Sequence, residues 1–182
     1  LLLISKIEQE QKLLSYLKAL QNITLELTKI TSLDEFYKRA VELGINNLGF
    51  ERLGLMLYDP DTEMARGTYG TDKDGNVVDE RDLVIAPTDL TKILFRSVEN
   101  ETHFVVDEDA DLYSNFEYIG KGWNAVATLW NDTQMMGWLA IDNAVIHRPI
   151  DPAQLEILAL YALSIASQLT KKQAQHQLAS HP

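Results

Sequence analysis

Aromatic and polar side chains gather in the second half of this sequence, in a pattern that favours ligand binding over catalysis. Small-molecule sites are concave and mostly apolar, with a few polar groups that orient the ligand. Aromatic residues concentrate between positions 113 and 138, and polar residues lie among them and on an earlier predicted strand. The predicted ligand-binding residues are Tyr58, Arg66, Phe116, Tyr118, Trp123, Asn124, Thr128, Trp138 and Asp142.

Arg66 says most about the ligand, because a guanidinium inside a cavity selects an anion. The alternative is that the aromatic residues fill a core and Arg66 extends into solvent. The sequence leaves both readings open. In the first reading, the ligand contacts Trp123 or Trp138 and one polar group from Arg66, Asn124 or Asp142.

No other chemistry has its residues in place. The chain has no cysteine, which excludes disulfides, thiolate metal sites and cysteine nucleophiles. No two histidines have the spacing of a helical metal site, and a surface role for His103 is favoured over haem ligation. The acidic run 107–111 lacks the ligand spacing of a Ca²⁺ loop. Nucleophile-elbow, zinc-protease and Walker motifs are missing, so an enzyme using carboxylates is the least favoured reading.

Charge and hydropathy narrow the possible partners. The 182 residues carry a formal net charge of −11, which repels phosphate backbones and anionic membrane surfaces. We therefore expect no nucleic-acid or membrane contact. No apolar run approaches the roughly 20 residues of a membrane span, and no signal peptide is recognisable. These features predict a cytoplasmic domain, and because the chain starts with Leu1 we expect it to be a piece of a longer protein.

The elements that position these residues follow from periodicity and turn signals. A helix is expected over 1–30, a second over about 33–47 ended by Gly49, and a short one over 89–98. Strands are expected over 52–58, 64–69, 103–106, 123–130 and 135–141, with an irregular strand within 77–85. The segment 107–120 is expected to be a loop with a helical turn. The closing helix starts at the N-cap Asp151 and is expected to run to 172, with a frayed tail over 173–182.

Strand alternation assigns the faces of the first predicted strand. Leu53, Leu55 and Leu57 share one face, which we expect to meet the leucine-rich terminal helices. The opposite, mixed face is then expected under the segment 107–120. On the last strand Trp138, Ala140 and Asp142 alternate in the same way, and small Ala140 leaves room for a ligand. A register error of one residue would exchange all of these assignments.

The first helix carries a heptad pattern with two possible uses. Leucines recur every seven residues, and a tyrosine or isoleucine follows each by three, at Leu13, Tyr16, Leu20, Ile23, Leu27 and Ile30. This seam either packs on the helix's own domain or forms half of a dimeric coiled coil. Together with the apolar stripe of the last helix, it predicts a homodimer through the terminal helices.

The order of elements and two stretches of sequence resemble the GAF domain of bacterial signalling proteins. The more specific stretch runs from Gly122 to Trp130, continues through Met136 to Asn143 and Arg148 to Ile150, and ends in the capped helix; the run 70–82 is also similar. The resemblance covers about residues 20–169. It implies an α+β fold with a central antiparallel sheet of five to six strands, helices from both termini on one face, and short helices or loops on the other.

The resemblance also implies a function. It divides the chain into a signalling helix (1–30), a GAF domain (31–170) and a tail or linker, and predicts a regulatory module that relays ligand binding to an output domain such as a histidine kinase or a diguanylate cyclase. Family members that attach a bilin or reduce methionine sulfoxide use cysteines, which this chain lacks. The Asn-Lys, Phe, Asp-Glu signature of cyclic-nucleotide binders is also missing. The alternative is a structural dimerisation module without a ligand.

Overall fold

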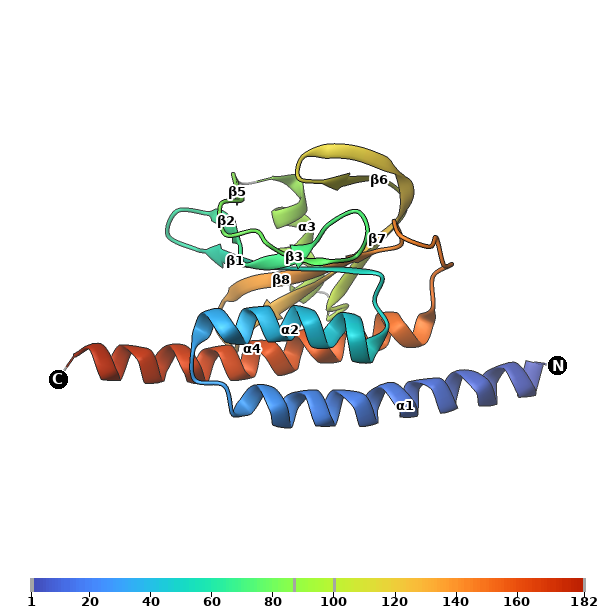
Figure 1. The fold of residues 1–182 in the computed structure, drawn as a ribbon, viewed down its shortest axis with the longest axis horizontal. Helices are drawn as coiled ribbons and strands as arrows, with labels where there is room; N and C mark the ends of the chain where they lie inside the picture. The colour runs from blue at the N-terminus through green and yellow to red at the C-terminus, as the bar shows by residue number, and fades with distance from the viewer. Residues whose placement is uncertain (1, 87, 100, 182) are drawn as a thin grey trace.

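The computed structural model describes residues 2–86, 88–99 and 101–181. Four helices and eight strands follow one another in an order that starts and ends with a long helix (Figure 1). They are α1 (Leu2–Thr28), α2 (Leu33–Leu48), β1 (Arg52–Asp59), β2 (Met64–Gly67), β3 (Tyr69–Thr71), β4 (Val77–Asp79), β5 (Val84–Ile85), α3 (Asp89–Glu99), β6 (Phe104–Ser114), β7 (Glu117–Trp130), β8 (Met135–Asp142) and α4 (Pro152–Ser180).

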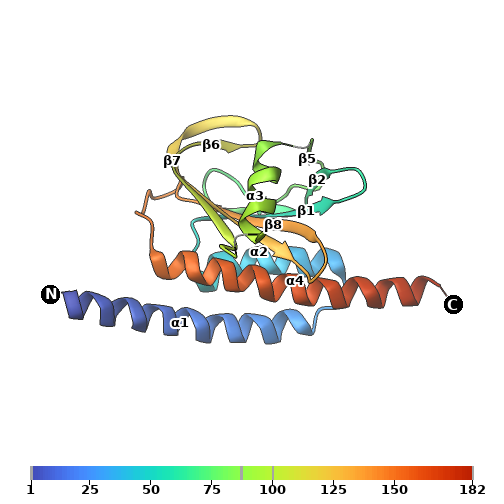
Figure 2. The same cartoon turned by 180° about the vertical axis from the view of Figure 1, so that it is seen from behind.

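A six-stranded sheet in the order β5-β2-β1-β8-β7-β6 forms the centre of the fold, and every neighbouring pair is antiparallel. The short strands β3 and β4 form a separate ribbon. The helices α2 and α4 lie along one face of the sheet with α1 outside them, and α3 lies on the other face with the β6–β7 hairpin (Figures 1 and 2). This arrangement confirms the predicted α+β fold.

The two faces of the sheet bury different residues, as strand alternation predicts. Leu53 and Leu55 of β1 join the larger core with α2 and α4, and Leu57 packs against it. Met56 and Tyr58 join a smaller core on the opposite face, together with Leu94 of α3. The face assignment for β1 is therefore confirmed.

The predicted helix starts are built from local hydrogen bonds. Ser32 caps α2 by accepting a hydrogen bond from the backbone N–H of Glu35, and Gly49 ends this helix in the left-handed conformation at φ 70°. Asp151 caps α4 through the N–H of Ala153. The side-chain amide of Gln154, three residues after the N-cap Asp151, donates to the carbonyls of Leu48 and Gly49, which joins the start of α4 to the end of α2.

Two predicted boundaries are wrong. The segment 107–120 is not a loop with a helical turn, because β6 and β7 continue through it as one long hairpin. Asn115 and Phe116 both have positive φ (49° and 66°), which allows a tight two-residue turn between the strands. The tail is also helical, because α4 continues to Ser180 through a run of alanine and glutamine, with Ser180 Oγ bonded to the carbonyl of His176.

The heptad seam of α1 packs on its own domain. Leu20, Ile23 and Leu27 are buried in the larger core, and Tyr16 and Ile30 pack against it. The seam is therefore occupied within the chain, which removes the reason for expecting it to form a coiled coil with a second copy.

Polar side chains of α4 hold α1 in a fixed parallel register. Ser164, Gln168, Lys172 and His176 follow one another every four residues along one side of α4. Ser164 Oγ lies 3.0 Å from Thr24 Oγ1, and Gln168 and His176 bond the carbonyls of Thr24 and Thr31. The ammonium of Lys172 is buried and bonds the carbonyls of Thr28 and Ile30 at the C-terminal end of α1. We refer to these contacts as the α1–α4 polar ladder.

Replacing Lys172 tests the α1–α4 polar ladder. Lys172→Ala removes the charged donor from its part-buried contacts with the carbonyls of Thr28 and Ile30. Because a hydrogen bond to a charged group is worth about 1.5–3 kcal/mol, we expect a loss of up to about that size in the free energy of unfolding. Lys171→Ala is the matched control, since Lys171 is exposed one position earlier on the same helix. Urea unfolding followed by circular dichroism measures both, and equal midpoints for the two variants would show that the lysine contact does not hold the helices.

Candidate functional site

A cavity of about 410 Å³ lies on the mixed face of the sheet, under the β6–β7 hairpin. We call it the sheet cavity. Its floor is formed by β1, β7 and β8, through Met56, Asn124 and Trp138 among others, and its walls come from β6 and from the segment around Glu80. Its volume is within the range of small-molecule sites in proteins.

A larger space of about 860 Å³, the outer chamber, adjoins the sheet cavity. The two share Arg52, Thr71, Glu80, Ile85 and Tyr113. The tip of the hairpin, including Phe116, lines the far side of the outer chamber. Arg52 and Glu80 therefore lie where the two spaces meet.

Arg52 is the cation of this site, and it is not fully paired. Its side chain is only 11 % exposed, and its Nη2 donates to the carbonyl of Tyr113 on the hairpin at 2.8 Å. Its Nε lies 3.5 Å from Asp142 Oδ1, close enough for charge pairing but not aligned as a hydrogen bond. Among the described residues, Nε and Nη1 are buried without an acceptor. Buried donors are normally satisfied, so these two groups indicate a missing acceptor.

Glu80 is the anion that faces the same space. Its carboxylate lies over Gly70, where any side chain at position 70 would collide with it, and its backbone carbonyl lies against Gly67 in the same way. Burial raises the pKa of Glu80, and the nearby Arg52 guanidinium opposes part of that shift. Within the described part of the chain, the Glu80 carboxylate has neither a hydrogen bond nor an ion pair. Gly67 and Gly70 thus leave space for the Glu80 carboxylate in the site, and that carboxylate has no hydrogen-bond donor among the described residues.

Asp142 closes the site at the end of β8. Burial raises its pKa and Arg52 opposes that effect, while its Oδ1 accepts a hydrogen bond from the N–H of Ala144. Asp142 lies opposite Asn124 in the β7–β8 register and opposite Arg52 in the β1–β8 register. Three neighbouring strands therefore bring these polar groups together.

The structure brings together only part of the predicted binding set. Asn124, Trp138 and Asp142 line the sheet cavity, and Phe116 lines the outer chamber. Tyr58 and Thr128 share the mixed face but are buried, and Tyr58 packs edge-on against Phe95. Tyr118 is exposed on the hairpin beside Tyr113.

Trp123 and Arg66 lie on the other face of the sheet, so their predicted place beside Trp138 is wrong. Trp123 belongs to the helix-side core and donates from Nε1 to the carbonyl of Arg148 at 2.8 Å. Since Asn124 is paired with Asp142, its neighbour Trp123 must point away from the cavity. Arg66 is paired with Leu57, which faces the helices.

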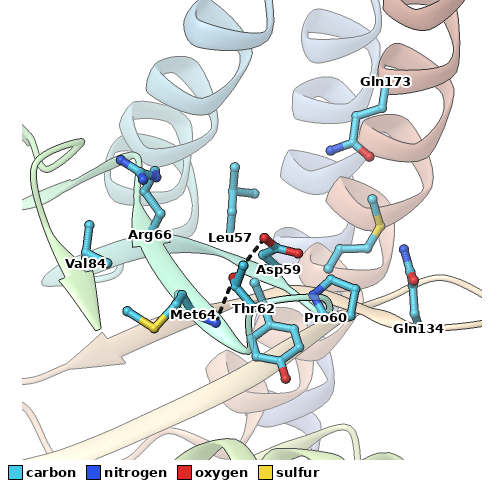
Figure 3. Close-up of a pocket in the computed structure, with 12 residues that line it drawn as sticks. Leu57, Asp59, Pro60, Thr62, Met64, Arg66, Val84, Gln134 and Gln173 are labelled. Carbon is cyan, nitrogen blue, oxygen red and sulfur yellow. Dashed lines mark hydrogen bonds between the residues drawn. The ribbon is translucent and has the colours of Figure 1, made fainter. Parts of the chain in front are cut away.

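Arg66 lines a different hollow of about 400 Å³ at the β1–β2 end of the sheet, beside Gln173 of α4 (Figure 3). We call it the edge groove. The carboxylate of Asp59 in this groove is already satisfied, because it accepts a hydrogen bond from Thr62 Oγ1 (Figure 3) and another from the N–H of Asp61. Arg66 itself is exposed. The edge groove lacks the buried, unpaired groups of the sheet cavity, which makes the sheet cavity the better candidate.

Sequence reasoning missed Arg52, Glu80 and Tyr113. Arg52 could have been found, because it lies on the mixed face of the first predicted strand, in which most of the following residues are apolar. Nothing in the sequence places Glu80 on that face, because the β3–β4 ribbon and the turn after it carry it there through tertiary packing.

Within the described residues, no three histidine, aspartate or glutamate side chains gather closely enough to hold a metal ion. No helix of the described chain combines the length and apolar character needed to cross a membrane.

The fold is that of the GAF domain. No protein-family model and no curated protein sequence matches this chain. Among solved structures, the chain is similar to the GAF domain of a phosphoenolpyruvate-protein phosphotransferase from Coxiella burnetii, with a TM-score of 0.70 and 14 % identity over 91 % of this chain and 98 % of that one.

Two further solved structures show the same fold. A methyl-accepting chemotaxis protein fragment has a TM-score of 0.66 at 14 % identity, over 84 % of this chain and 98 % of that one. A free methionine-R-sulfoxide reductase from Neisseria meningitidis, solved with its substrate, has a TM-score of 0.66 at 14 % identity, over 90 % of this chain and 93 % of that one. These likenesses establish the GAF fold predicted from the sequence.

Replacing Glu80 tests whether its carboxylate costs stability. Burial raises the pKa of Glu80 in the folded state, so the ionised carboxylate destabilises the folded protein above that pKa. Below the ordinary glutamate pKa of 4.5 this cost disappears, because Glu80 is protonated in both the folded and the unfolded state. We expect Glu80→Gln to unfold at higher urea than wild type at pH 7, with the difference closing as the pH falls towards 4. Glu117→Gln, on the exposed hairpin, is the control. A less stable Glu80→Gln protein at pH 7 would contradict the assignment.

Proposed function

We propose that this chain is a non-catalytic sensory GAF module that binds a small molecule in the sheet cavity and passes the bound state to its terminal helices. The observation that carries this proposal is the pair of buried Arg52 N–H groups without an acceptor, beside a carboxylate without a donor. Leaving buried polar groups unpaired costs about 1–3 kcal/mol each, and a ligand that satisfies them recovers that energy. The Neisseria neighbour, solved with its substrate, supports the idea that this fold can hold a small molecule.

A chain of contacts connects the cavity to the terminal helices. Glu51, next to Arg52, accepts hydrogen bonds from the N–H groups of Val145, Ile146 and Arg148. Asn143, next to Asp142, accepts from the N–H of Trp123 and donates to the carbonyl of Arg148. These contacts fix the loop that leads into α4.

The first turn of α4 is in turn tied to α1. Lys12 of α1 forms an ion pair with the N-cap Asp151 at 2.8 Å, and the α1–α4 polar ladder continues this contact along both helices. A ligand that moves Arg52 or Asp142 therefore acts on both terminal helices through the loop 143–150. Such coupling is typically worth about 1–3 kcal/mol.

Ligand binding is tested first by thermal shift with a library of metabolites. A ligand that binds only the folded state raises the melting temperature further as its concentration increases. We expect a hit whose effect is lost in Arg52→Gln and kept in Arg66→Gln, which changes the same residue type on the opposite face of the sheet. If no compound shifts the melting temperature, the alternative gains support: a structural module that relays signals without a ligand.

Dimerisation through the terminal helices is part of this proposal, but through a different surface from the heptad seam. The outward face of α1 exposes Leu14 (54 %) and Leu25 (59 %), and α4 exposes Leu160 and Leu163. Exposed apolar residues gathered on neighbouring helices mark interaction surfaces. We propose that a second copy of this chain covers this apolar surface. An output domain would then receive paired helices.

Light scattering tests the dimer. We expect about twice the chain mass of 20.6 kDa at micromolar concentration, and a monomer for the double variant Leu14→Lys with Leu25→Lys, because the dimer would bury two charges. Both positions are exposed, so the domain should stay folded. Leu178→Lys, near the far end of α4, is the control. A wild-type protein that stays monomeric at hundreds of micromolar would rule out the dimer.

A further inference from the structure

The sheet cavity holds a cation and an anion that are close but do not satisfy each other. Arg52 and Glu80 line both the cavity and the outer chamber, and each affects the other electrostatically. Nevertheless, no ion pair between them is found in the described residues. Arg52 contacts Asp142 and the carbonyl of Tyr113, and Glu80 lies over the glycines at positions 67 and 70.

This gap defines the polar part of a ligand. Arg52 Nε and Nη1 require an acceptor, and the planar guanidinium suits a carboxylate. Glu80 requires a donor, and an ammonium group suits a carboxylate in the same way. A purely anionic ligand would meet Glu80, Asp142 and Asp111 around the same cavity and be repelled. A ligand with both charges on neighbouring atoms matches both residues.

The rest of the sheet cavity defines the other part of the ligand. Beyond the charged pair, Met56, Ile85, Leu112 and Trp138 form an apolar part of the lining, and Gly54 and Ala140 leave space between them. The rest of the lining is polar or acidic, with Thr71, Asn124, Asp107, Asp111 and Asp142. The apolar part suits an uncharged, apolar or aromatic group attached to the polar part of the ligand.

We propose that the sheet cavity binds a free α-amino acid with an uncharged side chain. Its carboxylate lies against the Arg52 guanidinium, its ammonium against the Glu80 carboxylate, and its side chain along Trp138 and Met56. This inference rests on the proposed sensory function and names the class of ligand that the site takes.

The experiment is calorimetric titration of the protein with each of the common L-α-amino acids. The best binder is then compared with its amide, which lacks the carboxylate, and with its N-acetyl derivative, which lacks the ammonium. Each charge-assisted contact is expected to change affinity by about tenfold or more, so both derivatives should bind at least that much more weakly.

Two variants assign the contacts. Arg52→Gln should remove the preference for the acid over the amide, and Glu80→Gln the preference for the free amine over the N-acetyl derivative. Arg66→Gln and Glu117→Gln are the matched controls and should keep both preferences. Cooperative urea unfolding of every variant confirms that each is folded, and Glu80→Gln is expected to be at least as stable as wild type at pH 7.

The outcomes separate the ligand class from the function. If no amino acid binds, but another compound binds and depends on Arg52, the ligand class is wrong and the sensory function stands. An amino acid that binds without discriminating against its amide or N-acetyl derivative also overturns the ligand class. If no compound of any class binds, the ligand class and the sensory function both fail.

Discussion

An antiparallel strand buried on both faces can offer only every second residue to each side, and this constraint shapes the whole molecule. In β1, the leucines that face the helices alternate with Arg52, Gly54, Met56 and Tyr58. The pairing of β1, β8 and β7 then places Arg52, Asp142 and Asn124 side by side. The larger core and the charged cavity are therefore two results of one register. A slip of one residue would put a guanidinium among the helices and leucines into the cavity.

The two faces of the sheet differ in how closely their side chains pack. The helix face is filled by large apolar side chains, including Tyr161, whose hydroxyl donates to the carbonyl of Ala40 and whose pKa is raised by complete burial. The mixed face has a smaller core near α3 and a hollow under the hairpin. Close packing gives the first face its rigidity, while beside the hollow two buried nitrogens of Arg52 have no acceptor among the described residues.

Polar contacts connect the site to the loop that leads into α4. Glu51 and Asn143, which anchor the loop before α4, are the immediate sequence neighbours of Arg52 and Asp142. The same loop ends at Asp151, which caps α4 and pairs with Lys12 of α1. This loop therefore connects the residues beside the cavity to both terminal helices.

The sequence by itself determined the local structure. Caps at Ser32 and Asp151, the left-handed Gly49 and the alternation of Leu53, Leu55 and Leu57 are short-range features, and each was found where periodicity and turn chemistry placed it. The resemblance over residues 20–169 gave the fold. The hairpin over 107–120 was missed because its turn has Phe116 at positive φ, a conformation that favours glycine or asparagine.

Only the tertiary structure decided how these elements meet. It showed that the heptad seam of α1 is buried within the domain, and that Trp123 and Arg66 lie on the helix side of the sheet. It also showed that Glu80 reaches the cavity over Gly67 and Gly70. Periodicity gives the spacing of faces along one strand, but not which strand is its neighbour or which loop covers it. Those choices depend on contacts between residues far apart in sequence, so the charged pair of the site became visible only in the folded chain.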